Sequence, residues 1–344
     1  MGASLGLSDL YQPFPSRKSP FTDDAIAASR GSAERRGLLS SASSRRRFEA
    51  FAPLAGAFFP DASPERLTAC TYFVHWLFFV DDLCDGEEHS QDLGALHCML
   101  EEQVRVLRTG LAPRRASGLT AFTASVSRRI APLFGAARHG AFCDVVEEYL
   151  LDGVLMATVD RAARTVPELE PYAQRREADG ASHTVIALVE LARDITLPDS
   201  LRDDVDVARI RRVCARILSF VNDLVSYEKE LREGSQNNLL CVLQTQHGMT
   251  FPDAVAAAVT LINELTREHQ GLGLALSARD PVLRAWVRGL EDLIAGNAQW
   301  SFDTRRYASA TSPFPELRHP MESGEVVIMP DPGRAPQELR ERSR

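Results

Sequence analysis

The sequence predicts an all-α fold, a single α-helical bundle domain, and three observations lead to this prediction. Apolar residues recur at helical spacing along most of the chain, from about residue 22 to residue 304. No segment of convincing length alternates apolar and polar residues as a half-buried strand does. The chain has 344 residues, 44% of them apolar and 25% charged, which suffices for the core of one large soluble domain.

The composition narrows the range of partners. The formal net charge of −8 argues against nucleic acid or an anionic membrane as the main partner. The longest apolar stretch, residues 69–80, is too short for stable membrane insertion, and the N-terminus lacks the apolar region of a secretory signal. The six cysteines form no CxxC pair, so we expect free thiols in a reducing compartment. We therefore expect a cytoplasmic protein.

The helices follow in order along the chain. Residues 1–20 are rich in Pro and Ser and are predicted to form an irregular N-terminal arm, and Gly and Pro break the helical pieces that follow. Leu67–Cys84 is predicted to be a strong buried helix that ends near Gly86, because glycine favours a helix C-terminus. Its His75 is predicted to be a core histidine. Further helices are predicted at 92–109, 118–134, 138–164, 205–233, 251–272 and 281–304.

One element between these helices is predicted to be interrupted. The segment 166–179 contains two prolines, and an apolar run from His183 to Ile195 begins shortly after Gly180. We expect one long helical element with a break near Gly180. Residues 21–308 are assigned to the α-helical domain, and 309–344, rich in Pro, Glu and Arg, to a loose C-terminal tail.

The first of two polar motifs closes the helix predicted at 67–84. At about 100° per residue, Asp81 and Asp85 lie within about 40° of each other on one helix face. Val74 and Phe78 continue this face upstream and are expected to line a pocket with apolar surface. Carboxylates at a helix C-terminus oppose the helix dipole, and bound Mg²⁺ would reverse that cost because it prefers oxygen ligands. The alternative is an acidic helix end that faces water.

The second motif lies within the helix predicted at 205–233. Asn222, Ser226 and Glu230 follow one another at intervals of four residues and span about 80° of one face. An amide oxygen, a hydroxyl and a carboxylate make an oxygen site that suits Mg²⁺. The alternative is the solvated face of an ordinary amphipathic helix, and two motifs in one chain argue against both alternatives. The opposite side of the helix carries an apolar stripe of Val207, Ile210, Cys214, Ile217, Val221 and Leu224.

Together the two motifs resemble those of class I terpene synthases. The first resembles the aspartate-rich DDxxD motif of this family, and the second resembles its NSE motif, including a lysine, Lys229, just before the glutamate. The length of the single helical region resembles that of microbial and fungal sesquiterpene cyclases. The resemblance therefore implies the isoprenoid synthase type of α-helical bundle.

Two further matches to this family occur in the expected order. Arg176 lies 46 residues before Asn222, at the spacing of the family's diphosphate-sensing arginine, and Arg175 stays an alternative for that role. Asp179 and Gly180 fall at the positions of the linker and the helix-break effector. Near the end of the helical region, a basic–aromatic pair resembles the family's C-terminal Arg-Tyr pair, namely Arg306-Tyr307.

The resemblance implies a mechanism and a set of ligands. It implies three Mg²⁺ ions, held by Asp81 with Asp85 nearby and by the second motif. It implies that carbonyl groups at the helix break near Gly180 stabilise an allylic cation, and that aromatic faces in the pocket do so afterwards. Helix phase favours Phe78 among the aromatic candidates, which are Phe73, Trp76, Phe78, Phe220 and Trp300. The groups implied to bind diphosphate are Arg176, Lys229, Arg306 and Tyr307.

The expected activity is Mg²⁺-dependent ionisation and cyclisation of a prenyl diphosphate. Farnesyl diphosphate is the expected substrate, and the product is a sesquiterpene hydrocarbon or alcohol. A monoterpene synthase acting on geranyl diphosphate, a trans-prenyltransferase and a non-catalytic helical scaffold stay open as alternatives. The sequence leaves open whether the protein is a monomer or a homodimer.

Overall fold

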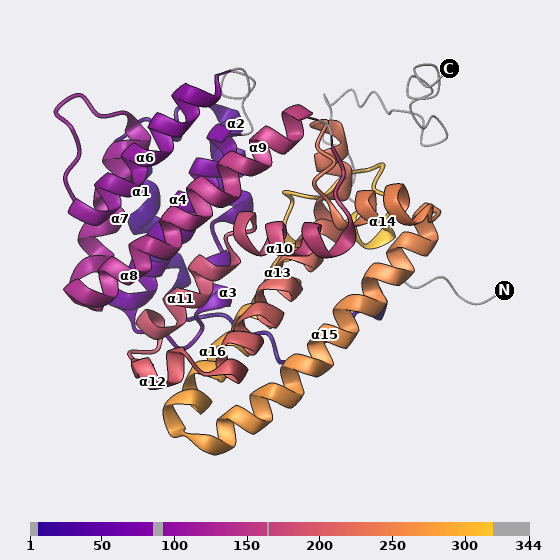
Figure 1. Cartoon of the computed structure of the whole chain (residues 1–344). Coiled ribbons are helices and arrows are strands. Elements are labelled where there is room, and N and C mark those ends of the chain that lie inside the picture. The colour runs from indigo at the N-terminus through magenta and orange to yellow at the C-terminus, as the bar shows by residue number, and fades with distance from the viewer. Residues whose placement is uncertain (1–5, 85–91, 164, 319–344) are drawn as a thin grey trace.

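Helices carry the regular structure of the protein (Figure 1). The structure is a computed structural model that describes residues 6–84, 92–163 and 165–318, and of these it describes 161–163 by their backbone only. Within those ranges no strand occurs, as the sequence predicts. The helices are α1 Thr22–Glu34, α2 Ala42–Phe51, α3 Leu54–Phe58, α4 Pro64–Cys84, α6 Leu93–Thr109, α7 Gly118–Phe134, α8 Ala136–Glu147, a π-helix Glu148–Val154, α9 Leu155–Ala163, α10 Leu169–Asp179, α11 Ser182–Ala192, α12 Asp199–Arg202, α13 Val205–Arg232, α14 Leu239–His247, α15 Phe251–Arg279 and α16 Pro281–Asp303.

The bundle is built around α4 and α13. Helix α4 packs against α1, α3, α7 and α11, while α13 packs against α10, α11, α15 and α16. Figure 1 shows the N-terminal helices and the later helices α13–α16 side by side, and the contact of α3 with α16 joins the two groups. The apolar stripe predicted on α13 faces the core, since Val207, Ile210, Cys214, Ile217, Val221 and Leu224 are all buried. Among the helices of the described ranges, none combines the length and the apolar character needed to cross a bilayer.

His75 lies in the core of α4, as predicted. Its Nδ1 lies 2.8 Å from Ser29 Oγ, and its Nε2 lies 3.1 Å from the carbonyl oxygen of Ala52. Burial lowers the pKa of this imidazole to about 4, so it is neutral at neutral pH. Both ring nitrogens are therefore occupied by structural contacts.

Capping residues fix the start of α13 and both ends of α14. The side chain of Asp204 accepts hydrogen bonds from the backbone N–H groups of Asp206 and Val207 at the start of α13, at 2.9 and 3.2 Å. Asn238 caps α14 by accepting from the Leu240 N–H at 2.9 Å. Gly248 ends α14 in the left-handed conformation, with φ of 64°.

Several predicted boundaries differ from the structure. The helix predicted at 138–164 consists of α8, the π-helix and α9, and the helix predicted at 251–272 continues to Arg279. Helix α14 was not predicted. The predicted break near Gly180 is present, because α10 ends at Asp179 and α11 begins at Ser182.

The loose tail predicted from residue 309 is wrong for residues 309–318. The Ser309 and Thr311 hydroxyls donate hydrogen bonds to Glu228 Oε1, at 3.0 and 2.7 Å. Phe314 and Leu317 are buried. The cause is tertiary packing, because apolar contacts with the bundle override the Pro-rich composition of this segment. Residues 319–344 lie outside the described residues.

From Gly6 onward, the N-terminal arm is irregular apart from the 3₁₀ turn Leu7–Asp9, yet it is anchored to the bundle. The backbone N–H of Tyr11 donates to Asn263 Oδ1 at 2.6 Å, and Asn263 Nδ2 donates to the carbonyl oxygen of Asp9 at 2.9 Å. The arm therefore lies along α15.

Candidate active site

A cavity of about 1390 Å³, including its open mouth, lies among α4, α13, α16 and the break between α10 and α11. One part of its lining is apolar, and the other consists of charged and hydrogen-bonding groups. The two types of side chain needed to bind an amphiphilic anion therefore share one cavity. The apolar lining residues include Leu54, Phe58, Val74, Leu77, Phe78, Val154, Val185, Leu218 and Trp300.

The acidic motif at the end of α4 contributes Asp81 to this cavity. Arg306 Nη2 donates to Asp81 Oδ2 at 2.8 Å, and the Asp81 side chain is 48% exposed. Asp82 instead accepts from Arg47 Nε at 2.8 Å and is also paired with Arg306. Asp85, the other predicted metal ligand of this motif, lies outside the described residues.

Helix α13 brings the second motif to the same cavity. Asn222, Ser226 and Glu230 all line it, as their spacing predicts. The Ser226 hydroxyl donates to Glu230 Oε1 at 2.7 Å, and Asn222 Nδ2 donates to the hydroxyl oxygen of Tyr307 at 2.8 Å. Burial, reinforced by the nearby Asp223 carboxylate, raises the pKa of Glu230 to about 7.

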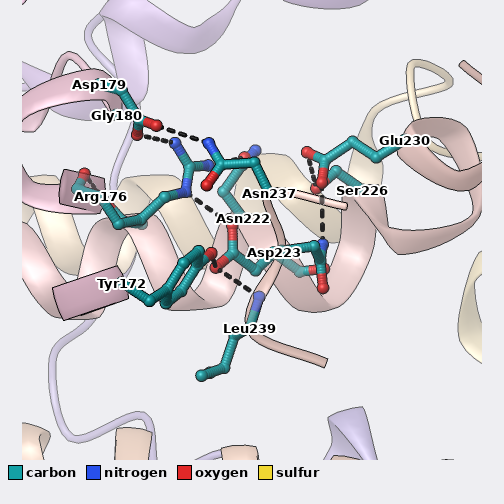
Figure 2. Close-up of polar contacts among 12 residues, drawn as sticks. Tyr172, Arg176, Asp179, Gly180, Asn222, Asp223, Ser226, Glu230, Asn237 and Leu239 are labelled. Carbon is teal, nitrogen blue, oxygen red and sulfur yellow. Dashed lines mark hydrogen bonds and ion pairs between the residues drawn. The ribbon is translucent and has the colours of Figure 1, made fainter. Parts of the chain in front are cut away.

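Arg176 projects from the last turn of α10 toward α13 (Figure 2). Its Nε donates to Asp223 Oδ1 at 2.9 Å, its Nη1 to Asp179 Oδ1 at 2.7 Å and its Nη2 to Asn222 Oδ1 at 3.0 Å. Burial alone would lower the pKa of this guanidinium, but the two carboxylates raise it well above its usual value. Arg175 instead pairs with Asp160 away from the cavity, so the structure brings Arg176 to the site.

A second layer of contacts holds Arg176 in place. Asp223 is fully buried, and besides Arg176 it accepts hydrogen bonds from the Tyr172 hydroxyl and, at 3.2 Å, from the backbone N–H of Leu239. Figure 2 shows these donors converging on the Asp223 carboxylate. The guanidinium is therefore fixed in orientation before any ligand binds.

The break between α10 and α11 depends on a close approach of backbone to α13. A Cβ on Gly180 would lie 2.5 Å from Ser219 Oγ and 2.8 Å from the carbonyl oxygen of Arg176, so only glycine fits. The φ of Gly180 is −77°, which does not itself require glycine. The following residue, Ala181, adopts the left-handed conformation with φ of 56° and is the N-cap of α11. The chain thus changes direction within two residues at the edge of the cavity.

The remaining predicted anion-binding residues also line the cavity. Lys229 Nζ lies 2.7 Å from Glu233 Oε2. The Arg306 guanidinium lies over the Phe78 ring, 5.0 Å from its centroid, and the ring of Tyr307 packs edge-on against Trp300 at 5.7 Å. Among the aromatic candidates, only Phe78 and Trp300 line the cavity, while three lie in the core, namely Phe73, Trp76 and Phe220.

Sequence reasoning missed several residues that hold this site together. Asn237 and Asn238 contact carboxylates of the site from the turn after α13, and Arg47 contacts Asp82 from α2. A detectable signal existed only for Asn238, an asparagine directly before an apolar run, which is typical of a helix N-cap. Arg47 and Tyr172 become neighbours of the motifs through tertiary packing alone.

The donor set fits a hard divalent cation. Asp81 and Glu230 supply carboxylates, Asn222 an amide oxygen and Ser226 a hydroxyl, and no nitrogen or sulfur ligand is among them. The basic groups nearby suit a polyanion, so the cavity has the chemistry of a site for a metal and a phosphate-containing ligand.

Comparison with known proteins agrees with this chemistry. Residues 72–268 match the sequence model of a family described as "Terpene synthase family 2, C-terminal metal binding". A (+)-T-muurolol synthase described as (2E,6E)-farnesyl diphosphate cyclizing, from Roseiflexus castenholzii, is 29% identical over 304 residues, which cover 87% of this chain and 93% of that protein. Germacrene A synthase of Nostoc punctiforme is 25% identical over 304 residues, 87% of this chain and 94% of that protein.

Solved structures show the same fold. The SVS_A2 protein from ancestral sequence reconstruction superposes with a TM-score of 0.78 at 22% identity, over 85% of this chain and 89% of that one. Linalool/nerolidol synthase from Streptomyces clavuligerus gives a TM-score of 0.74 at 22% identity, over 85% of this chain and 99% of that one. The predicted all-α class is confirmed.

Proposed function

Because the chain belongs to terpene synthase family 2, whose members bind metal through the matched region, we propose that it cyclises farnesyl diphosphate. The chain is a terpene synthase, a lyase that acts on diphosphates. The proposed product is a sesquiterpene hydrocarbon or alcohol, formed with release of diphosphate. One observation carries the proposal: oxygen donors of α4 and α13, the Arg176 guanidinium and an apolar lining share one cavity.

We propose that Mg²⁺ binds between the two polar motifs, one at the end of α4 and the other on α13. Asp81, with Asp85, would hold it on one side, and Asn222, Ser226 and Glu230 would hold it on the other. The family resemblance implies three ions with diphosphate bound. Bound there, Mg²⁺ would act as a Lewis acid that stabilises negative charge on the departing diphosphate.

The basic groups of the chain bind and orient the diphosphate in this proposal. Arg176, Lys229 and Arg306 supply positive charge, and the guanidinium groups suit bidentate contacts to phosphate oxygens. Arg306 exchanges its contacts with Asp81 for the substrate, while Tyr307 lies beside it. The fixed orientation of Arg176 means that little reorganisation accompanies ionisation.

The apolar part of the cavity binds the hydrocarbon chain and excludes water. The faces of Phe78 and Trp300 stabilise positive charge as the cation rearranges. Asp179 orients Arg176, and the carbonyl groups at the Gly180 break present partial negative charge to the nascent allylic cation. The chemistry needs no side-chain nucleophile.

Relatives support the choice of farnesyl diphosphate, since the name of the Roseiflexus castenholzii enzyme specifies farnesyl diphosphate cyclisation. Geranyl diphosphate is the second candidate, because the linalool/nerolidol synthase has also been solved with 2-fluorogeranyl diphosphate. The family assignment favours a synthase over a chain-elongating prenyltransferase.

Kinetics of diphosphate release test the substrate assignment. Purified protein with Mg²⁺ is given farnesyl, geranyl and geranylgeranyl diphosphate separately, and kcat/KM is measured for each. We expect the highest value with farnesyl diphosphate. A higher value with geranyl diphosphate would make the protein a monoterpene synthase, and release only when isopentenyl diphosphate is added would make it a prenyltransferase.

A further inference from the structure

Two consecutive asparagines lie in the turn that joins α13 to α14. Gly234, with φ of 73°, lets the chain reverse after α13, and the Ser235 N–H donates to the carbonyl oxygen of Glu230 at 2.9 Å. The turn therefore folds back onto the C-terminal end of α13. This places Asn237 and Asn238 against two different carboxylates of the site.

Asn238 is fully buried and uses its whole amide. Its Nδ2 donates to Glu230 Oε2 at 2.9 Å and to the carbonyl oxygen of Asp223 at 2.8 Å, while its Oδ1 accepts from the Leu240 N–H. Only this orientation of the amide puts a donor against the carboxylate. Because Ser226 donates to the other oxygen of Glu230, both carboxylate oxygens are held.

Asn237 contacts the other side of the site. Its Nδ2 donates to Asp179 Oδ2 at 2.6 Å, and Arg176 donates to the second oxygen of Asp179 at 2.7 Å. Figure 2 shows the Asn237 amide and the Arg176 guanidinium meeting the same carboxylate at the helix break. The orientation of Asp179 is therefore set jointly from α10 and from this turn.

We propose that Asn237 and Asn238 are positioning residues that align Asp179 and Glu230 with each other from a single turn. Two adjacent side-chain amides of this turn thus link Glu230, a proposed metal ligand on α13, to Asp179 at the helix break. The inference rests on the proposed function, since it assigns the asparagines a role in metal binding and ionisation at the same site. Hydrogen bonds to carboxylates are among the stronger ones, and partners of metal ligands affect metal affinity.

The experiment uses variants that separate positioning from helix capping. Serine caps a helix about as well as asparagine, so Asn238→Ser keeps the cap of α14 and removes the amide donor to Glu230. Asn237→Leu removes the donor to Asp179 without adding charge. Gln236→Glu, on an exposed side chain of the same turn, is the matched control.

Mg²⁺ is titrated calorimetrically into the wild type and each variant in the presence of inorganic diphosphate, and turnover of farnesyl diphosphate is measured in parallel. We expect Asn238→Ser to weaken Mg²⁺ binding by about tenfold. We expect Asn237→Leu to lower kcat by about tenfold with KM unchanged, because an interaction that matters only during ionisation affects kcat alone. Gln236→Glu should match the wild type in both measurements.

Thermal unfolding shows whether each variant is folded. Asn238→Thr, which also keeps an N-cap oxygen, replaces Asn238→Ser if that protein does not fold. A folded Asn238 variant that binds Mg²⁺ like the wild type would overturn the assignment of Asn238. An unchanged kcat in Asn237→Leu would overturn that of Asn237. A wild type that neither binds Mg²⁺ with diphosphate nor turns over substrate would instead overturn the proposed function and this inference with it.

Discussion

Arg176 and Arg175 are neighbours in sequence with different environments. Arg176 donates to Asp223, Asp179 and Asn222, whereas Arg175 pairs with Asp160 outside the cavity. A guanidinium that makes three directed contacts cannot be replaced by the single ammonium group of lysine without losing some of them. The two positions therefore offer a matched comparison.

We predict that Arg176→Lys lowers kcat/KM for farnesyl diphosphate by about 100-fold, while Arg175→Lys leaves it within about twofold of the wild type. The reason is that, of these two arginines, only Arg176 reaches the diphosphate in the proposed complex. Steady-state kinetics of both variants with Mg²⁺ provide the measurement. The reverse ranking would assign the sensor role to Arg175.

The carboxyl group of Glu230 makes the metal-free protein sensitive to pH. Its pKa is raised from 4.5 to about 7, chiefly by burial, so the folded protein binds this proton more tightly than the unfolded chain does. The resulting stabilisation is present below pH 4.5 and is lost as the pH rises through 7. Ionised Glu230 is then the form that would bind Mg²⁺.

We predict that Glu230→Gln is more stable than the wild type at pH 8 in EDTA, by on the order of 2–3 kcal/mol, and that this gap closes toward pH 5. The amide keeps the shape of the side chain and cannot ionise. Urea unfolding of both proteins between pH 5 and pH 8 measures the gap. A constant difference across this range would contradict the raised pKa.

At the scale of elements, the π-helix Glu148–Val154 packs against the end of α10. A Cβ on Gly153 would lie 2.7 Å from the carbonyl oxygen of Ala178 and 2.8 Å from the Cα of Asp179, and both atoms belong to rigid backbone. Tyr149 and Val154 of the same π-helix line the cavity. Short π-helical segments are frequent at functional sites. This one packs against the backbone at the break between α10 and α11.

We predict that Gly153→Ala destabilises the protein by about 1–3 kcal/mol and changes the ratio of terpene products, because the methyl group displaces Asp179. Gly140→Ala is the control, since nothing lies within 4 Å of a Cβ at that helical position. It should stabilise the protein by about 0.5–1 kcal/mol and leave the products unchanged. Thermal unfolding and product analysis of both variants provide the comparison. Unaltered products from Gly153→Ala would show that the π-helix does not influence the product ratio.

Helical periodicity predicted the long helices well, because α4, α7 and α13 bury one continuous apolar face or lie wholly inside the core. The same periodicity placed Asn222, Ser226 and Glu230 on one face. Helical periodicity could not predict the π-helix, because the single residue by which a π-bulge extends an α-helix leaves the apolar pattern nearly unchanged. Helix α14 was missed because it has only 9 residues.

The missed parts of the site depend on contacts between distant segments. Arg47 meets Asp82 across 35 positions of sequence, and Asn237 meets Asp179 across 58. No local pattern encodes such pairs, because they arise when helices pack. The motif spacing nevertheless indicated Arg176 while leaving Arg175 as an alternative, and the structure brings Arg176 to the cavity.

At the scale of the whole molecule, one hydrophobic core runs from Leu7 to Leu317. It joins the N-terminal arm, the bundle and the segment after α16. An ion-pair network reinforces this connection, because Asp292 of α16 binds both Arg17 of the arm and Arg193 at the end of α11. The walls of the cavity therefore share one continuous core.

We predict a single cooperative unfolding transition in urea. Circular dichroism follows all the helices, while fluorescence follows Trp76 in α4 and both Trp286 and Trp300 in α16, so the two signals sample both halves of the bundle. The midpoints should coincide because the core is continuous. Two separated midpoints would show that the N-terminal helices and helices α13–α16 unfold independently.

This cavity is proposed to convert farnesyl diphosphate to a sesquiterpene with the help of Mg²⁺. The most direct measurement is gas chromatography–mass spectrometry of the volatile products that purified protein forms from farnesyl diphosphate, with Mg²⁺ and with EDTA, alongside Asn222→Ala. We predict a C15 hydrocarbon or alcohol that appears with Mg²⁺, disappears in EDTA and is absent from the variant. Absence of any C15 product from folded wild-type protein with Mg²⁺, or a product that persists in EDTA, would show that the proposed Mg²⁺-dependent activity is wrong.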